Sequence, residues 1–370
     1  MSSFVRRASA AGLLILAAGV GTTVQASASP ARASVAPAGS AGAAQVGAGW
    51  IGRQFSPGGY IITAGAPDPS STVQAVLAFA ASGVGGRKAD AGINWLRKHF
   101  KSYVSPGGVD DPGSLAYVIL AAQAMGDNPK EFGGTSTSNN LVQRLVNTQR
   151  TTGSDAGLFG TQDPTYDGAF RQGLSLMALA NAGMSNAAGV TWLQDQQCSD
   201  GGWESYRSDL GTPCPPPDPD TFTGPDTNST ALATEGLVAQ GAVHTAENHD
   251  ITAFFESAQN TDGGFGLIGA SSQSPDPDST GEVIQALVAL GQLTNPAFTQ
   301  SGGTPPTALE TFQLGCSAKA SHRGAYVFPG EKGPNMLASV QAVPGAAEVA
   351  FPLKAQTLKP GLPKLTCPSS

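Results

Sequence analysis

The stretch WLQDQQCSDGGW at residues 192–203 recurs at identical spacing as FFESAQNTDGGF at residues 254–265. In both copies a short helical run containing glutamine leads into an Asp-Gly-Gly turn that closes on an aromatic residue. Four looser copies close at Tyr60, Val109, Phe159 and Tyr326. Repetition of this kind indicates a fold built from one supersecondary unit whose neighbours share a continuous core. The sequence therefore predicts six copies of that unit.

The second half of each copy is an apolar segment rich in small residues. Asp or Asn at a helix start accepts a hydrogen bond from the first turn, and glycine just past a helix end takes the left-handed conformation. Each segment has an Asp or Asn at its start and a glycine at its end, so we expect six complete helices. The expected starts are Asp68, Asp111, Asp167, Asp226, Asp278 and Asn335, and the expected terminal glycines are Gly83, Gly126, Gly183, Gly241, Gly291 and Gly345.

These second helices are apolar around most of their circumference, as residues 232–239 and 283–290 illustrate. A helix that is apolar nearly all round is buried nearly all round, and small side chains allow close packing. We therefore place these six helices inside and the glutamine-containing helices outside. The predicted fold is all-α, an (α/α)6 barrel or toroid of six helix-pair repeats over residues 47–350.

The first 28 residues have the composition of an export signal. Arg6 and Arg7 precede a short apolar run at residues 12–20, and Ala26-Ser27-Ala28 offers a cleavage site. The run is too short to span a bilayer. We expect a signal peptide at residues 1–28, a disordered tether at 29–46, an extended tail at 351–370, and a secreted chain that does not insert into the membrane after cleavage.

Cysteine content and charge agree with export. Four cysteines in an exported chain favour two disulfides, and we expect Cys198–Cys214, which bracket a proline-rich loop, and Cys316–Cys367, which would pin the tail. No CxxC spacing indicates a metal site. The formal net charge is −7, and an acidic chain without dense Lys/Arg patches is a poor partner for nucleic acid.

The Gln-x-x-Asp-Gly-Gly-Trp/Phe element resembles the α/α-toroid superfamily of prenyltransferase/squalene oxidase repeat proteins. This group contains squalene and terpene cyclases, protein prenyltransferase β-subunits, complement-type thioester domains, and cobalamin carriers of the transcobalamin and intrinsic-factor type. A prenyltransferase zinc site would need an Asp-x-Cys before an inner helix, and a thioester would need more than Gly315-Cys316-Ser317 provides. The resemblance therefore leaves two functions for comparison, cyclase and carrier.

The cyclase hypothesis depends on residues 276–280, Asp-Pro-Asp-Ser-Thr, which are similar to the Asp-x-Asp-Asp-Thr acid motif of the cyclases. Protonation of an alkene needs a carboxylic acid that stays protonated, and the resemblance implies that Asp278 is this acid. Two observations oppose the hypothesis. Asp278 stands where the other copies have an N-cap, and family cyclases resemble two fused toroids, whereas this chain has room for one.

We favour the carrier hypothesis, a secreted non-catalytic binding toroid, because it requires export, one toroid and no catalytic group or catalytic cofactor. In the carriers that this chain resembles, polar residues where the inner helices begin hold the amide groups of the corrinoid. The resemblance implies a small hydrophobic or amide-rich ligand, with cobalamin as the candidate, and a membrane transport component as a candidate partner. The expected ligand contacts are Asp68, Asp111, Tyr166, Asp167, Asp226, Asp278 and Asn335.

A third hypothesis is a protein-interaction scaffold whose ring is filled by side chains. The interior of the ring distinguishes the three hypotheses. A large aromatic chamber favours a cyclase, a wide polar rim favours a carrier, and a filled ring favours a scaffold.

Overall fold

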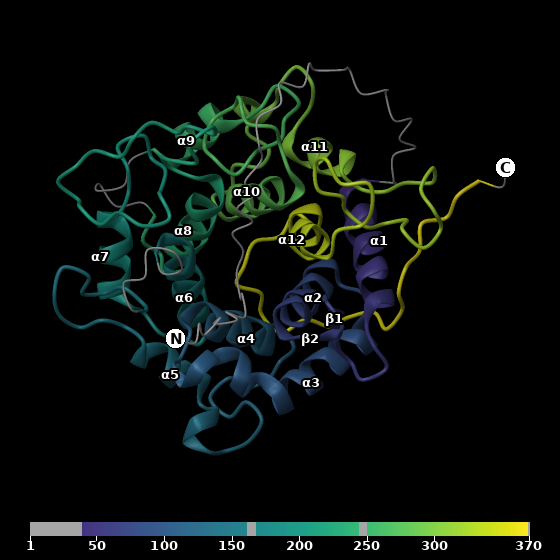
Figure 1. Cartoon of the computed structure of the whole chain (residues 1–370), viewed down its shortest axis with the longest axis horizontal. Helices are drawn as coiled ribbons and strands as arrows, with labels where there is room; N and C mark the ends of the chain where they lie inside the picture. The colour runs from purple at the N-terminus through teal and green to yellow at the C-terminus, as the bar shows by residue number, and fades with distance from the viewer. Residues whose placement is uncertain (1–38, 161–167, 244–249, 369–370) are drawn as a thin grey trace, which may run out of the picture.

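A computed structural model describes residues 39–160, 168–243 and 250–368. Within these residues, six α-helices form the inner wall of a ring and six lie outside it (Figure 1). The inner helices are α2 (Pro69–Ser82), α4 (Pro112–Ala124), α6 (Ala169–Asn181), α8 (Thr227–Ala239), α10 (Pro277–Ala289) and α12 (Met336–Ala346). The outer helices are α1 (Gly39–Gln54), α3 (Gly86–Val104), α5 (Leu141–Asn147), α7 (Ala187–Asp195), α9 (Ile251–Ala258) and α11 (Pro305–Thr311).

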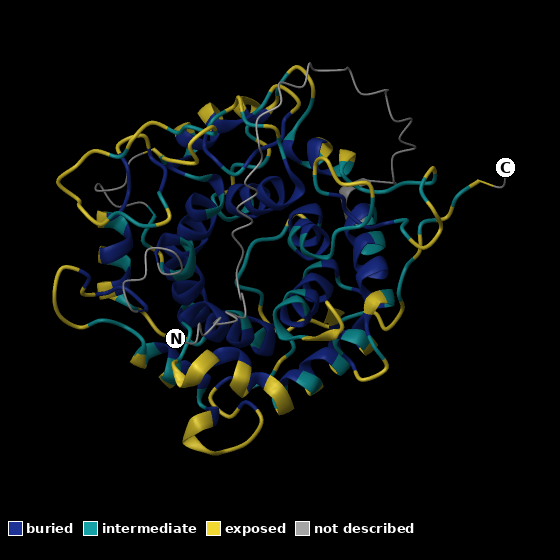
Figure 2. Cartoon of the chain, viewed as in Figure 1, coloured by how far each residue is buried: buried dark blue, intermediate teal, exposed yellow. Residues whose placement is uncertain are grey.

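The inner helices close into a complete ring. Each contacts the next in chain order, and α12 packs against α2. Figure 2 shows that buried residues dominate the inner helices, whereas exposed residues gather on the outer helices and loops. The predicted all-α toroid is confirmed, and so is the assignment of the small-residue helices to the inside.

Little regular structure lies outside these helices in the described chain. Strands β1 (Ile61–Thr63) and β2 (Ala66–Asp68) form an antiparallel hairpin in register Ile61 to Asp68, directly before α2. Short 3-10 turns occur at Pro106–Gly108, Thr137–Asn139 and Pro296–Phe298. No helix among the described residues has both the length and the apolar character needed to cross a membrane.

The repeated glutamine locks the turn that follows it. Gln197 Nε2 donates to Gly201 O at 2.9 Å, and Gln259 Nε2 donates to Gly263 O at the same distance. Both glycines have φ of +93°, and a Cβ at Gly201 would lie 2.2 Å from the carbonyl oxygen of Asp250, at the start of the next outer helix. Glycine is therefore required both by conformation and by close approach.

The aromatic residue that closes each turn is tied to an inner helix. The backbone N–H of Trp203 donates to Thr230 Oγ1 at 2.9 Å, and that of Phe265 donates to Thr280 Oγ1 at 3.0 Å. Tyr326 makes the same bond to Ser339 at 2.9 Å. All three rings are fully buried. The repeated aromatics are thus core residues that join outer and inner helices.

Two expectations about where helices begin and end were wrong. Residues 39–46 are not a tether, because α1 begins at Gly39 and buries Ala43 and Ala44 completely against the ring. Gly345 does not end its helix. It lies inside α12, where a Cβ would be 2.5 Å from the carbonyl oxygen of Gly281 in α10, and the left-handed residue beyond the helix is Glu348, with φ of 52°.

Residues 348–368, the C-terminal strap, cross the face on which the inner helices end. Gln356 N donates to Ala124 O at 2.8 Å, and Lys359 N donates to Gly83 O at 3.0 Å. Leu362 then packs on Gly52 of α1. The strap therefore covers the C-terminal end of the ring, and these bonds place the ends of α2 and α4 on one face.

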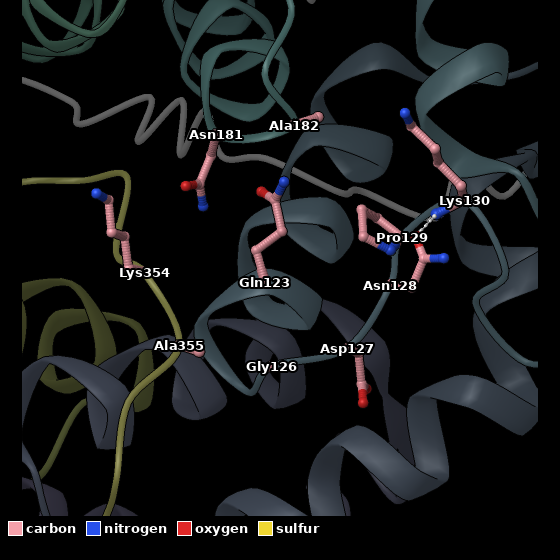
Figure 3. Close-up of a pocket in the computed structure, with 10 residues that line it drawn as sticks. All are labelled: Gln123, Gly126, Asp127, Asn128, Pro129, Lys130, Asn181, Ala182, Lys354 and Ala355. Carbon is pink, nitrogen blue, oxygen red and sulfur yellow. Dashed lines mark hydrogen bonds between the residues drawn. The ribbon is translucent and has the colours of Figure 1, made fainter.

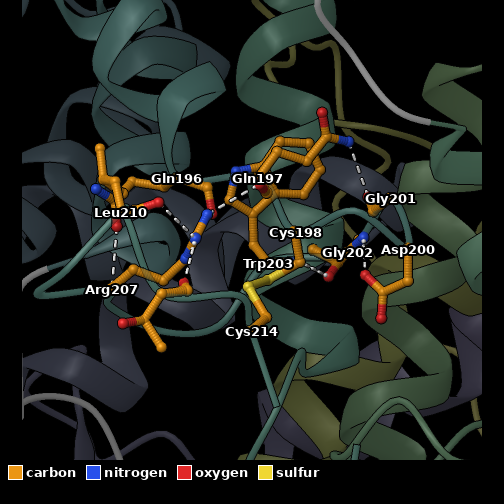
Figure 4. Close-up of a disulfide and its surroundings, with 12 residues drawn as sticks. Gln196, Gln197, Cys198, Asp200, Gly201, Gly202, Trp203, Arg207, Leu210 and Cys214 are labelled. Carbon is orange, nitrogen blue, oxygen red and sulfur yellow. Dashed lines mark hydrogen bonds between the residues drawn. A yellow bond between two sulfur atoms is a disulfide. The ribbon is translucent and has the colours of Figure 1, made fainter. Parts of the chain in front are cut away.

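Both expected disulfides are present. Cys316–Cys367 fixes the far end of the strap, with 5.6 Å between Cα atoms, and Cys198–Cys214 closes the proline-rich loop, with 5.7 Å. Figure 4 shows Arg207 beside the second bond, where it donates to Gln197 O at 3.1 Å. Glu204 lies close to these sulfur atoms, but sulfurs joined to each other are not available as metal ligands.

Candidate acid site in the bore

The helix starts that were expected to hold a ligand lie at the rim of the toroid and cap their own helices. Asp68 Oδ1 accepts from Ser71 N at 3.0 Å, and its Oδ2 accepts from Ser71 Oγ at 2.7 Å. Asp226 and Asn335 accept from Ser229 N at 2.6 Å and Ala338 N at 3.0 Å. The carboxylate and amide oxygens of this rim therefore have structural partners.

Asp111 has a second partner besides its own helix. Its Oδ1 accepts from Ser114 N at 2.7 Å, and its Oδ2 pairs with the Arg171 guanidinium of α6 at 3.0 Å. Tyr166 and Asp167, the other expected ligand contacts at this rim, lie outside the described residues. The described start of α6 is Gly168, which makes no side-chain cap.

Asp278 is not an N-cap, contrary to the expectation from the repeats. The cap of α10 is Asp276, whose Oδ1 accepts from Ser279 N at 2.8 Å and whose Oδ2 accepts from Ser279 Oγ at 2.9 Å. Asp278 lies in the first turn, 6% exposed, and its Oδ1 has no hydrogen-bond partner among the described residues. The extra Asp-Pro pair shifts the cap by two positions and frees Asp278 from a structural role.

Asp278 shares one face of α10 with Glu282 and Gln285, because residues at i, i+4 and i+7 line up along a helix. Glu282 and Gln285 line a cavity inside the ring, which we call the bore. Its volume is about 20 Å³, enough for about one water molecule. The other lining residues are Gln74, Leu77, Tyr117, Val340, Gln341, Pro344 and Phe351.

A third carboxyl group faces the same interior. Glu235 of α8 is fully buried, and its Oε2 accepts from Phe351 N of the strap at 3.0 Å. Its Oε1 has no partner in the described chain. The part of the chain that lines the bore contributes no cationic side chain. Three carboxyl groups thus face an interior without compensating charge.

Burial keeps these groups protonated. It raises the pKa of Glu282 to about 8. It raises the pKa of Asp278 well above its usual range, and Asp276, Glu282 and Glu331 add to the shift by repulsion. Burial, with a contribution from Glu282, does the same for the pKa of Glu235. Burial therefore favours the neutral form of all three carboxyl groups, and Glu282, with its pKa of about 8, is mostly neutral at pH 7.

A protonated carboxyl group has two chemical uses here. It can transfer its proton to a weak base, or its O–H can donate and its C=O accept hydrogen bonds from one ligand. Asp278 lies in the first turn of α10, one helical turn closer to the rim than Glu282.

The sequence argument found Asp278 but missed Glu235, Glu282 and Tyr117. A signal was present for the two glutamates, since each is the single charged residue in the middle of an otherwise small and apolar segment. A lone charge on a helix that is apolar all round must be buried, and buried charges cluster at functional sites. Tyr117 had no such signal, because tyrosine is common in cores.

The fold matches that of known α/α-toroids. The type II terpene cyclase MstE from Scytonema matches with a TM-score of 0.54 and 11% identity, over 84% of this chain and 98% of that chain. An MstE variant in complex with its substrate geranylgeranyl dihydroxybenzoate matches with a TM-score of 0.54 and 12% identity, over 84% and 97%. A protein from Actinoplanes matches with a TM-score of 0.50 and 15% identity, over 84% and 99%.

No protein-family model and no curated protein matches the sequence. Identities this low show a shared fold and leave the chemistry to the site. One sequence argument is nevertheless corrected. We expected cyclases to need two fused toroids, but the single ring of this chain covers 98% of a protein described as a type II terpene cyclase.

Proposed function

We propose, from the α/α-toroid fold that this chain shares with a type II terpene cyclase, that it is an exported cyclase-like enzyme in which Asp278 acts as the acid. The observation that carries the proposal is the buried side chain of Asp278 in the first turn of α10, whose Oδ1 accepts no hydrogen bond from any described residue. Asp68, Asp111, Asp226 and Asp276 each cap an inner helix, whereas Asp278 caps none.

The reaction follows from the state of this group. The Asp278 O–H transfers its proton to one carbon of a C=C bond. The π electrons form the new C–H bond, the second carbon is left as a carbocation, and the O–H electron pair stays on Asp278. Asp278 becomes a carboxylate, and it regains a proton from the product cation or from water. Burial, with repulsion from Asp276, favours the protonated form of Asp278 before transfer.

The substrate class is a neutral isoprenoid with a terminal alkene. The bore has room for about one water molecule in this structure, so it would have to widen before it could hold an isoprenoid substrate. Phe351 of the strap is the lining residue that belongs to no helix, so a wider bore would require the bond from Phe351 N to Glu235 to break. Two disulfides in the chain are compatible with export.

The test is turnover of squalene and of shorter polyprenes, followed by mass spectrometry of the extracted product. Asp278→Asn keeps the shape of the side chain and removes its acidic proton, so the rate should fall by about a hundredfold. Asp226→Asn is the matched control, because it changes an acid that caps α8. Product that persists in Asp278→Asn would refute the assigned role, as would equal losses in the two variants.

A second function is favoured by the narrowness of the bore. A ring with room for about one water molecule favours the scaffold hypothesis over a chamber that encloses a ligand, and it leaves the rim as the place where a small molecule could bind. A neutral Asp278 carboxyl complements a primary amide, since its O–H donates to the amide oxygen and its C=O accepts from the amide N–H. This pairing selects a neutral, amide-rich ligand, and a corrinoid is the one to test first.

Equilibrium dialysis of the mature protein against micromolar cobalamin tests this second function. Binding should retain the ligand, shift its visible spectrum, and weaken in Asp278→Leu. Free passage of cobalamin through the cell without retention would eliminate the corrinoid. A membrane transport component would then have no ligand to receive from this protein, so the same measurement bears on that proposed partner.

A further inference from the structure

A second hollow lies on the opposite face of the toroid, where the inner helices end. Figure 3 shows it between the ends of α4 and α6, with Gln123 and Asn181 at its centre and Lys130 and Lys354 on opposite sides. Its volume is about 620 Å³, which lies within the range of small-molecule sites. We call it the lysine groove.

The walls of the lysine groove are fixed by contacts between distant parts of the chain. Asn181 Nδ2 donates to Leu353 O at 3.0 Å, and Gln356 N donates to Ala124 O at 2.8 Å. These two bonds hold the strap against α6 and α4 on either side of Lys354. On the other wall, Asn128 Oδ1 accepts from Lys130 N at 3.0 Å and fixes the loop. The groove is a preformed surface.

Its charge is positive in an acidic protein. The net charge of the chain is −7, but Lys130 and Lys354 make no ion pair with any described residue. The one acid that lines the groove, Asp127, is paired with Arg97. Two exposed lysines without an ion pair therefore lie on opposite sides of the groove (Figure 3).

These lysines are not needed to cap the helix ends beside them. At the end of α4, Ala121 O accepts from Met125 N and Ala124 O accepts from Gln356 N. At the end of α6, Ala178 O accepts from Ala182 N. Because the backbone and the strap already satisfy these carbonyls, the structure gives the lysines no role as caps.

Gln123 gives the groove an uncharged hydrogen-bond acceptor. Its Oε1 is buried and accepts from no described residue, although a buried acceptor without a donor costs free energy. A ligand hydroxyl would supply that donor, while carboxylates would pair with the two ammonium groups. We propose that the lysine groove binds a small polycarboxylate that carries a hydroxyl group.

The experiment is calorimetric titration of the full mature chain with citrate and with tricarballylate, which has the same three carboxylates and no hydroxyl. Citrate should bind about fivefold more tightly, from the added hydrogen bond. Gln123→Leu should abolish that preference while retaining tricarballylate affinity. Lys130→Ala with Lys354→Ala should weaken both ligands by about tenfold.

The matched control is Lys101→Ala with Lys319→Ala, which removes two exposed lysines outside the groove. It should leave both affinities unchanged. The inference is overturned if wild-type protein binds neither anion at concentrations up to about 10 mM, if the control pair loses as much affinity as the groove pair, or if citrate and tricarballylate bind equally. Asp278→Asn should bind citrate normally, so this result does not depend on the proposed acid chemistry.

Discussion

Replacing Gly173 by alanine should lower the free energy of unfolding by about 3 kcal/mol, because the new methyl group has nowhere to go. Gly173 lies inside α6, and a Cβ there would be 2.1 Å from the carbonyl oxygen of Leu232 in α8. The obstacle is backbone, so no rotamer change relieves it. Gly236 of α8 lies opposite, 2.7 Å from Gly173 by the same measure. The two helices must separate, and the ring must deform with them.

Gly42→Ala is the matched control, since it makes the same change inside α1, where a Cβ would meet nothing within 4 Å. Alanine favours helix over glycine by about 1 kcal/mol, so this variant should be unchanged or more stable. Urea unfolding followed by helical circular dichroism gives both values. Similar midpoints for Gly173→Ala and wild type would show that the inner helices are not packed this closely.

Replacing Glu282 by glutamine should raise the free energy of unfolding by about 3 kcal/mol at pH 7 and remove part of its pH dependence. The pKa of Glu282 is about 8 in the folded protein, against an ordinary value of 4.5. Between these values the folded state holds a proton that the unfolded state has released. Wild-type stability therefore falls as pH rises from about 4.5 and levels off above about 8. Glutamine is neutral throughout and has nearly the same shape.

Urea unfolding of wild type and Glu282→Gln at a series of pH values from 4 to 9 checks this sign. The two proteins should agree at the acid end of the series and diverge steadily up to about pH 8. Glu256→Gln makes the same change at an exposed position of α9 and should follow wild type throughout. A destabilised Glu282→Gln at pH 7, or parallel pH profiles, would mean that Glu282 is charged in the folded protein.

The local elements were predictable because their signals are local. Asp68, Asp226 and Asn335 cap the helices that they were expected to begin, and Gly83, with φ of 70°, closes the helix that it was expected to end. A cap involves residues three apart, so a short stretch of sequence contains the whole interaction. The prediction for Gly345 was wrong because its main contact is distant in sequence. Its partner is Gly281, 64 positions earlier, and no local pattern distinguishes a glycine at a helix end from a glycine at a helix crossing.

In the candidate site, too, local sequence signals were informative and contacts between distant residues were not predictable. The motif at residues 276–280 identified Asp278, but its position in the repeat pattern suggested an N-cap. The structure gives that role to Asp276 because the helix begins at Pro277, which is suited to the first helical turn. The other bore acids come from different repeats, Glu235 from α8 and Glu282 from α10, and their proximity depends on how the ring closes.

The sequence by itself determined the repeat and the six inner and six outer helices, since these depend on periodicity and caps. Four cysteines allow three pairings, and the structure selected the expected one, Cys198–Cys214 with Cys316–Cys367. Tertiary structure decided what the ring encloses. Only the packing of α2, α4, α10 and α12, with Phe351 of the strap between them, reduces the bore to about 20 Å³. Burial on the inner helices raises the pKa of Asp278, Glu235 and Glu282, because the free energy of a charge depends on the surroundings that the whole fold creates.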